Sequence, residues 1–272
     1  MTATLMEAGA VVEKSDVRRP GMGAVLRSEW LKLTTVRSTW WTLAALVVLG
    51  AGLTTLICGL NADWLASDDA DESPGSFITW GMMIAQVCAV VVGTLCVTSE
   101  YGSGMIRTSF AAVPRRGAVL VAKAVVVAGV LFTIGTATAL LGYLGGNYFL
   151  DREGVGMALE GDVARSMYGS GLCLAALGLL SLAVGFLVRH TAAAISIVLA
   201  TVFVIGTMVM LIPGELGEWI TKLMPGNAAS ALVAPVAFNP DLLDAWTGFA
   251  VLLAEVGVVA ALAWYLLARR DA

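Results

Sequence analysis

Six long apolar runs divide this chain, and they constrain its fold more than any other feature. Each run approaches the length of about 20 residues that an α-helix needs to cross the hydrocarbon core of a bilayer. Of the 272 residues, 58% are hydrophobic and only 13% are charged, and the mean hydropathy is +0.86. A soluble domain carries about a quarter charged residues, so a membrane protein is predicted. The expected spans are residues 39–60, 77–98, 118–144, 168–188, 191–212 and 245–268.

The fourth and fifth runs are separated only by Arg189 and His190. A single helix through both runs would be far too long for one crossing, so the two polar residues predict a turn at the membrane surface. The predicted fold class is therefore all-α, with six transmembrane helices. Residues 1–22 have no apolar run and are expected to form a disordered cytoplasmic tail, and residues 23–270 form one six-span domain.

The distribution of Lys and Arg predicts the orientation of the spans. If the amino terminus is cytoplasmic, the outer loops hold only Arg152, Arg165 and Lys222 of the 16 basic residues. The positive-inside rule then places both termini in the cytoplasm, and a multi-pass protein of the cytoplasmic membrane is expected. The net charge of −4 argues against a nucleic-acid partner.

Residues 26–37, before the first span, have a helical pattern with one apolar side. Leu26, Trp30 and Leu33 recur at helical spacing, whereas polar side chains fall on the other side of the helix. This pattern predicts a short amphipathic helix in the headgroup layer, and the alternative is the cytoplasmic start of the first span. The polar residues are Arg27, Ser28, Glu29 and Lys32.

The loop 99–117 between the second and third spans reads SEYGSGMIRTSFAAVPRRG. Glu100 is expected at the inner surface, the chain is expected to turn on Gly102 and Gly104, and Pro114 should end the segment. The apolar residues between these turns predict a short helix parallel to the membrane and exposed to the cytosol; the alternative is an ordinary basic loop. These apolar residues are Met105, Ile106, Phe110 and Val113, and Arg115 and Arg116 follow as headgroup anchors.

The sequence lacks the residues that most enzymes need. His190 is the only histidine, and neither a GxxxxGK[ST] phosphate loop nor an HExxH motif is present. Catalysis and a resident metal or cofactor are therefore not expected, and His190 is interpreted as the cap of a surface turn. The four cysteines fall inside spans and are interpreted as small buried residues, although a bridge between Cys58 and Cys173 is an alternative.

Glu255 lies near the middle of the sixth predicted span. An ionised carboxylate is expensive there, so it must face a partner or an aqueous path, or else be protonated. Gln86, at similar depth in the second span, is a candidate partner for an intramembrane polar pair. Two interpretations stay open: a hydrogen bond that fixes helix packing, and a place on a substrate path.

The last outer segment, residues 213–244, is longer than a simple connection requires. Residues 215–223 and 227–233 are predicted to form short helices, interrupted by Pro225 and Gly226. The segment could act as a lid, or it could cover the helix ends.

Four stretches give the chain a resemblance to a known family. They are EWLKLTTVRSTWW, SEYGSGMIRTSFAAVPRRG, GFLVRHTAAAI and LMPGNAASAL, and the similarity extends over residues 26–270. The sequence resembles the actinobacterial permeases of the ABC-2 exporter family. The resemblance implies a six-span permease that pairs with a second permease subunit, as a homodimer or heterodimer, in contact with membrane lipid.

The resemblance also implies that cytoplasmic ABC ATPase subunits bind ATP and Mg²⁺ and drive the permease, which itself holds no cofactor. The family's elbow helix would map onto the segment with Leu26, Trp30, Lys32 and Leu33. Its coupling helix, which meets the ATPase, would map onto Ser99, Glu100, Tyr101, Gly104, Met105, Ile106 and Arg107.

Three functions are thus considered. The preferred hypothesis is an ATP-driven exporter subunit, and the alternatives are a non-transporting membrane scaffold or sensor and a proton-coupled carrier that uses Glu255. No cluster of polar residues selects a substrate.

Overall fold

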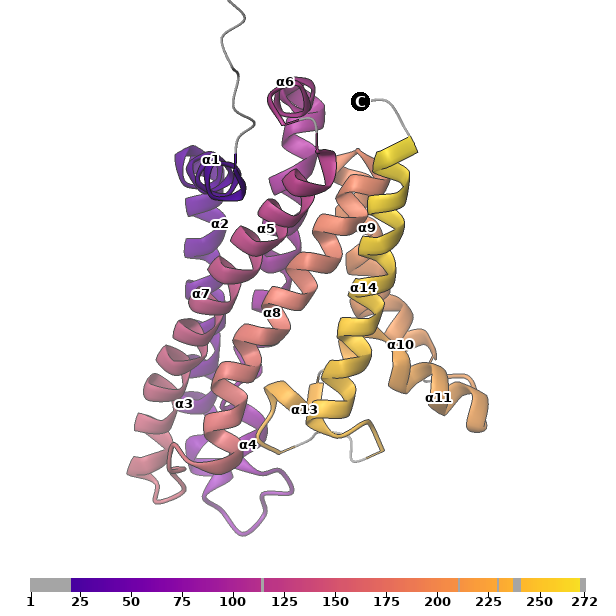
Figure 1. Cartoon of the computed structure of the whole chain (residues 1–272). Coiled ribbons are helices and arrows are strands. Elements are labelled where there is room, and N and C mark those ends of the chain that lie inside the picture. Colours follow the sequence, from indigo (N-terminus) through magenta and orange to yellow (C-terminus); the bar gives the residue numbers. More distant parts are fainter. Residues whose placement is uncertain (1–20, 114, 210, 229, 237–240, 270–272) are drawn as a thin grey trace, which may run out of the picture.

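The computed structural model describes residues 21–269 except 114, 210, 229 and 237–240 (Figure 1). Every regular element in this part of the chain is helical. The predicted tail, residues 1–22, lies almost entirely outside the described residues, and its last residue, Met22, already begins the first helix. The all-α prediction is therefore confirmed for the described chain.

Within the described residues, six helical segments are long and apolar enough to cross a membrane, as predicted. They make the chain a multi-pass membrane protein. The segments are Arg37–Leu65 (α2 Arg37–Val47, the π-helix η1 Val48–Gly52 and α3 Leu53–Leu65), Pro74–Ser103 (α4 Pro74–Phe77 and α5 Trp80–Ser103), Arg116–Arg152 (α7), Gly161–Val188 (α8), Thr191–Val209 (α9 Thr191–Leu199, the π-helix η2 Ala200–Ile205 and α10 Gly206–Val209) and Ala245–Arg269 (α14).

The observed helices differ from the predicted runs mainly at their ends. The third helix continues to Arg152, because the polar residues that follow its apolar run still complete helical turns. The fifth ends at Val209, three residues before the predicted boundary. At the start of α14, Asp244 accepts a hydrogen bond from the Thr247 backbone N–H at 3.3 Å. Hydrogen bonds from the hydroxyl and backbone of Thr247 hold the pKa of Asp244 below its ordinary value.

Two short helices lie across one end of the bundle (Figure 1). They are α1 (Met22–Thr35), which ends because Val36 is extended, and α6 (Met105–Ala112). The last turns of α14 reach the same end, where an Arg116 guanidinium N–H donates to the Leu267 carbonyl at 3.2 Å. The first and last helices that the structure describes therefore lie at the same end of the bundle.

Helix α8 forms the centre of the bundle and packs against α5, α7 and α14. In its most apolar window 72% of residues are buried, compared with 22% in α14. A Cβ atom on Gly93 of α5 would lie 2.2 Å from the Gly178 carbonyl oxygen of α8, so these two helices touch only because Gly93 has no side chain. Helix α14 by contrast leaves most of its apolar surface open.

The turn between the fourth and fifth spans has the predicted position. Arg189 adopts a left-handed conformation (φ 59°) and ends α8. His190 caps α9, because its Nδ1 atom accepts a hydrogen bond from the Ala193 backbone N–H at 3.3 Å. The interpretation of His190 as a capping residue is confirmed.

The segment before α14 contains the short helices α11 (Glu215–Leu223), α12 (Pro225–Ala228) and α13 (Ser230–Val233). Pro225 and Gly226 were predicted to interrupt the helices of this segment. The break instead falls at Met224, and Pro225 begins α12. Proline is favoured at the first helical position, where its missing N–H costs nothing. Helices α12 and α13 pack on α14, so they cover the end of that span.

Candidate functional site

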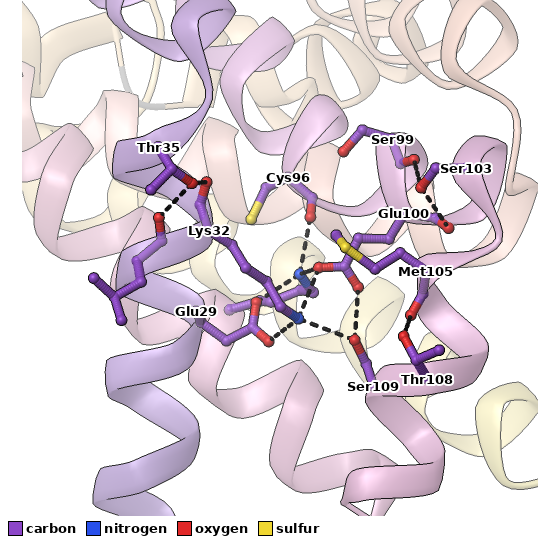
Figure 2. A network of polar contacts seen from close by, with 12 residues as sticks. Glu29, Lys32, Thr35, Cys96, Ser99, Glu100, Ser103, Met105, Thr108 and Ser109 are labelled. Carbon is purple, nitrogen blue, oxygen red and sulfur yellow. Dashed lines mark hydrogen bonds and ion pairs between the residues drawn. The ribbon is translucent and has the colours of Figure 1, made fainter.

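Four charged side chains from three helices form one ion network. Figure 2 shows Glu29, Lys32 and Glu100 of this network converging. Glu29 and Lys32 come from α1, Glu100 from α5 and Lys123 from α7. The Ser109 hydroxyl of α6 and the Cys96 carbonyl of α5 complete this ion network. Residues separated by up to 94 positions in the chain are thereby joined in one polar cluster.

Lys123 is the most deeply buried member, with a side chain that is 1% exposed. Its ammonium donates to Glu29 Oε2 at 2.6 Å, to Glu100 Oε1 at 2.6 Å and to the Cys96 carbonyl at 3.0 Å. An ammonium group has three N–H donors, and all three are used. Burial of this cation is tolerable only because two carboxylates face it.

Lys32 repeats the arrangement on the open side of the network. Its ammonium donates to Glu29 Oε1 at 2.8 Å, to Glu100 Oε1 at 3.0 Å and to Ser109 Oγ at 3.0 Å. Ser109 Oγ in turn donates to Glu100 Oε2 at 3.4 Å. Each carboxylate therefore contacts both ammonium groups, and the two positive and two negative charges balance.

The network links the short helices to the spans mechanically. Charge-assisted hydrogen bonds are stronger than neutral ones, and they strengthen further in a low-dielectric surrounding. Glu29 and Glu100 are each 3% exposed, so water does not compete for their oxygens. Helices α1, α5, α6 and α7 are consequently held as one unit at this end of the bundle.

Helix α6 has one buried and one open face. Ile106 and Phe110 are buried against the bundle, whereas Met105 and Arg107 are exposed. The turn into α6 falls on Gly104, which has φ 74°, and Gly102 still belongs to α5, so only one of the two predicted glycine turns forms. The short amphipathic helix predicted in loop 99–117 is confirmed; Pro114 lies outside the described residues.

The remaining residues predicted at this site are divided between the surface and the core. Ser99 is exposed, and its hydroxyl donates to the Leu95 carbonyl at 2.6 Å. Tyr101 packs edge-on against Phe186, and the Arg189 guanidinium lies 5.1 Å from the centre of the Tyr101 ring. Glu100, which was predicted at the inner membrane surface, is buried among the helices, where it pairs with Lys123.

The predicted amphipathic pattern of residues 26–37 is partly wrong. Leu33 is buried, Leu26 is partly buried and Trp30 is 49% exposed, which is compatible with a Trp30 side chain that faces lipid headgroups. Glu29, which was predicted on the polar side, points into the bundle with Lys32. A pattern of apolar residues assigns charged side chains to the outer face, and it misses a charge that a partner on another helix neutralises.

The predicted pair between Gln86 and Glu255 does not form. Gln86 of α5 lines a cavity with Trp80 and Phe203, whereas Glu255 of α14 lines a different one with Val184 and Val198. Glu255 Oε2 is buried, and no hydrogen-bond partner for it exists among the described residues. Similar depth in two spans does not determine which helix faces they share.

Sequence reasoning missed Lys123 as a site residue. Lys123 was not singled out, although it falls inside the third predicted run. The signal was the same as for Glu255, because a charge within an apolar run requires a partner or water.

The structure also bears on the cysteines and on metal binding. Cys58, Cys88 and Cys173 are buried, Cys96 is partly buried, and all four are free. Within the described ranges no group of three or more His, Cys, Asp or Glu side chains is placed to hold a metal ion.

The fold and this site define a polytopic helical membrane protein with a buried ion network at one end. No protein-family model and no curated protein matches the chain. Its function is therefore inferred from geometry and charge.

Proposed function

We propose that this chain is the membrane subunit of an ATP-driven exporter of the ABC-2 type. The observation that carries the proposal is the ion network, which joins the exposed short helix α6 to α1, α5 and α7. A partner that moves α6 would move the ends of two spans with it. Force transmission of this kind is what a permease driven by separate ATPases requires.

The charge distribution supports a cytoplasmic position for the α1 and α6 end. Arg107 and Arg115 lie on or beside α6, and Arg37 follows α1. Basic residues near span ends favour the cytoplasmic side, so both termini would be cytoplasmic. The open face of α6 with Met105 and Arg107 would then be accessible to a cytoplasmic ATPase.

The proposed mechanism has three steps. ATP and Mg²⁺ bind to the partner ATPases, which are needed because the chain has no phosphate loop. ATPase closure shifts α6, and the ion network passes this shift to α5 and α7. The bundle, paired with a second permease subunit, then opens outward and releases the substrate.

Co-purification with a candidate ABC ATPase, for example one encoded by a neighbouring gene, tests the docking step. Arg107→Glu reverses an exposed charge on α6, so it should weaken ATPase binding about tenfold or more without altering the fold. Arg152→Glu, at the far end of α7, is the matched control and should bind as the wild type does. Equal ATPase binding by both variants would exclude α6 as the docking helix.

The coupling step needs a separate variant. Glu100→Gln weakens the network but leaves the open face of α6 unchanged, so ATPase binding should persist. Permease-dependent stimulation of ATP hydrolysis in proteoliposomes should fall several-fold. Unchanged stimulation in Glu100→Gln would remove the network from the mechanism, and failure of any ATPase to bind the wild-type chain would favour a scaffold or sensor.

A proton-coupled carrier is the second candidate, and Glu255 favours it because its Oε2 atom has no hydrogen-bond partner in the described part of the chain. Transport by such a carrier would stop when the proton gradient is collapsed while ATP remains. Transport by the proposed exporter would continue under that condition.

A further inference from the structure

A side groove between α9, η2 and α14 contains Glu255. Its volume is about 690 Å³, which is within the range of small-molecule sites. The walls come from α8, α9 and α14, and Met224 and Pro225 close one end. Apart from Glu255 and Thr201, all the side chains that line the groove are apolar.

The carboxyl group in this groove lacks a partner. Glu255 Oε2 is buried, and none of the described residues forms a hydrogen bond with it. The Thr201 hydroxyl already donates to the Ile197 carbonyl at 2.8 Å. The residues that line the groove include no Lys, Arg or His. A buried carboxyl without a donor is costly, so the groove is incomplete as it stands.

The groove is on the outer face of the bundle. Helices α9 and α14 lie at one side of the bundle (Figure 1), and only 22% of the residues in the most apolar window of α14 are buried. Val258, beside the groove, is 70% exposed. An apolar molecule dissolved in the bilayer would therefore reach Glu255 sideways, without crossing the bundle.

We infer that the side groove binds a cationic amphiphile, a molecule with an apolar body and one ammonium group. The apolar walls would pack against the body, and the ammonium would donate to Glu255 Oε2. Charge complementarity excludes anionic amphiphiles, whose head group would meet the carboxylate in a medium of low dielectric constant. Binding in the groove does not depend on the proposed function. Only the assignment of this ligand class as the exported substrate rests on it.

A photolabelling experiment tests the inference without any ATPase. The purified chain in phosphatidylcholine nanodiscs is titrated with a long-chain alkylamine that carries a diazirine in its chain, and labelled peptides are identified by mass spectrometry. The wild type should be labelled on α9 and α14. In Glu255→Gln the concentration for half-maximal labelling should rise about ten- to a hundredfold, the range expected for loss of a charge-assisted hydrogen bond.

Three controls define the result. Glu153→Gln, an exposed acid after α7, should be labelled as the wild type is. Ala254→Phe fills the groove from an exposed lining position and should reduce labelling although Glu255 is intact. The alcohol with the same chain and diazirine should label the wild type and Glu255→Gln equally. Size-exclusion profiles and thermal unfolding confirm that each variant is folded.

Several results would overturn the inference. Equal labelling of the wild type and Glu255→Gln by the amine would show that Glu255 does not bind the ammonium group. Labelling of the wild type by the alcohol at the same concentrations as by the amine would show the same, and the groove would then bind apolar chains without selecting a cation. Efficient cross-linking of two Ala254→Cys chains would show that a second copy covers it. If the amine labels the chain but no ATPase co-purifies with the wild type, the exporter proposal fails and this site stands. If an ATPase binds and is stimulated but the amine does not label the chain, this site fails and the exporter proposal stands.

Discussion

The ion network around Lys123 and the side groove around Glu255 both place ionisable side chains in apolar helices, but they treat charge in opposite ways. In the network two ammonium groups and two carboxylates satisfy one another, and every ammonium N–H donates. In the groove a single carboxyl oxygen has no partner among the described residues. Buried charges that are paired hold helices together, whereas a buried carboxyl oxygen without a partner remains able to bind a ligand.

Removing Lys123 should have the largest effect on stability. Lys123→Met leaves Glu29 Oε2 without a donor and two buried carboxylates facing only one cation. We expect a loss of about 3–5 kcal/mol, measured as thermal unfolding in detergent. Asp162→Asn is the control: it breaks the 2.9 Å pair with Arg165 at a carboxylate that is 69% exposed, and should cost about 0–1 kcal/mol. Similar losses in both variants would mean that the network is not a buried unit.

Lys32→Met tests whether the stabilisation by each lysine of the network increases with its burial. The Lys32 side chain is 27% exposed, so water can reach the carboxylate oxygens that Lys32→Met would vacate. The expected loss is about 2 kcal/mol, smaller than for Lys123→Met, in the same unfolding measurement. A larger loss than for Lys123→Met would reverse the assigned order of burial.

Gly104 tests whether the direction of α6 matters to the network. The residue has φ 74° and open space around it, so Gly104→Ala adds only backbone strain, expected to cost about 1 kcal/mol. Gly102→Ala, two residues earlier inside α5 and also in open space, should be neutral or slightly stabilising. Equal effects of the two substitutions would show that the left-handed turn is not required.

Glu255 should give the smallest change, with the opposite sign. Glu255→Leu removes a carboxyl oxygen that has no partner among the residues the structure describes, so we expect no loss and a gain of up to about 1 kcal/mol. Thermal unfolding of ligand-free protein measures it. A loss comparable to that of Lys123→Met would mean that the carboxyl stabilises helix packing, and the contrast between the two regions would disappear.

Much of the fold could be predicted because its determinants are local. The length and hydropathy of a run such as 168–188 are visible in the sequence, and a run that matches the bilayer thickness is predicted to span the membrane. His190 could be interpreted as a cap because capping involves residues three positions apart. The amphipathic helix after Gly104 was found for the same reason.

The candidate site could be predicted only in part. Glu100 and Lys32 were identified, but their burial and their common partner Lys123 were not. Glu29 was placed on the wrong side of its helix, and Gln86 was paired with a residue that lines another cavity. In each case the error concerns which faces of distant helices meet.

The sequence alone predicted that this protein is helical and that it has six candidate spans, and it located each span to within several residues at its ends. Hydrophobicity and helical periodicity act over neighbouring residues, so they can be read along the chain. The tertiary structure was needed to show that Lys123 contacts two carboxylates and that Glu255 Oε2 has no hydrogen-bond partner among the described residues. An ionisable group in an apolar helix either finds a partner on another helix or remains without one. Which of the two occurs depends on the packing of helices far apart in sequence.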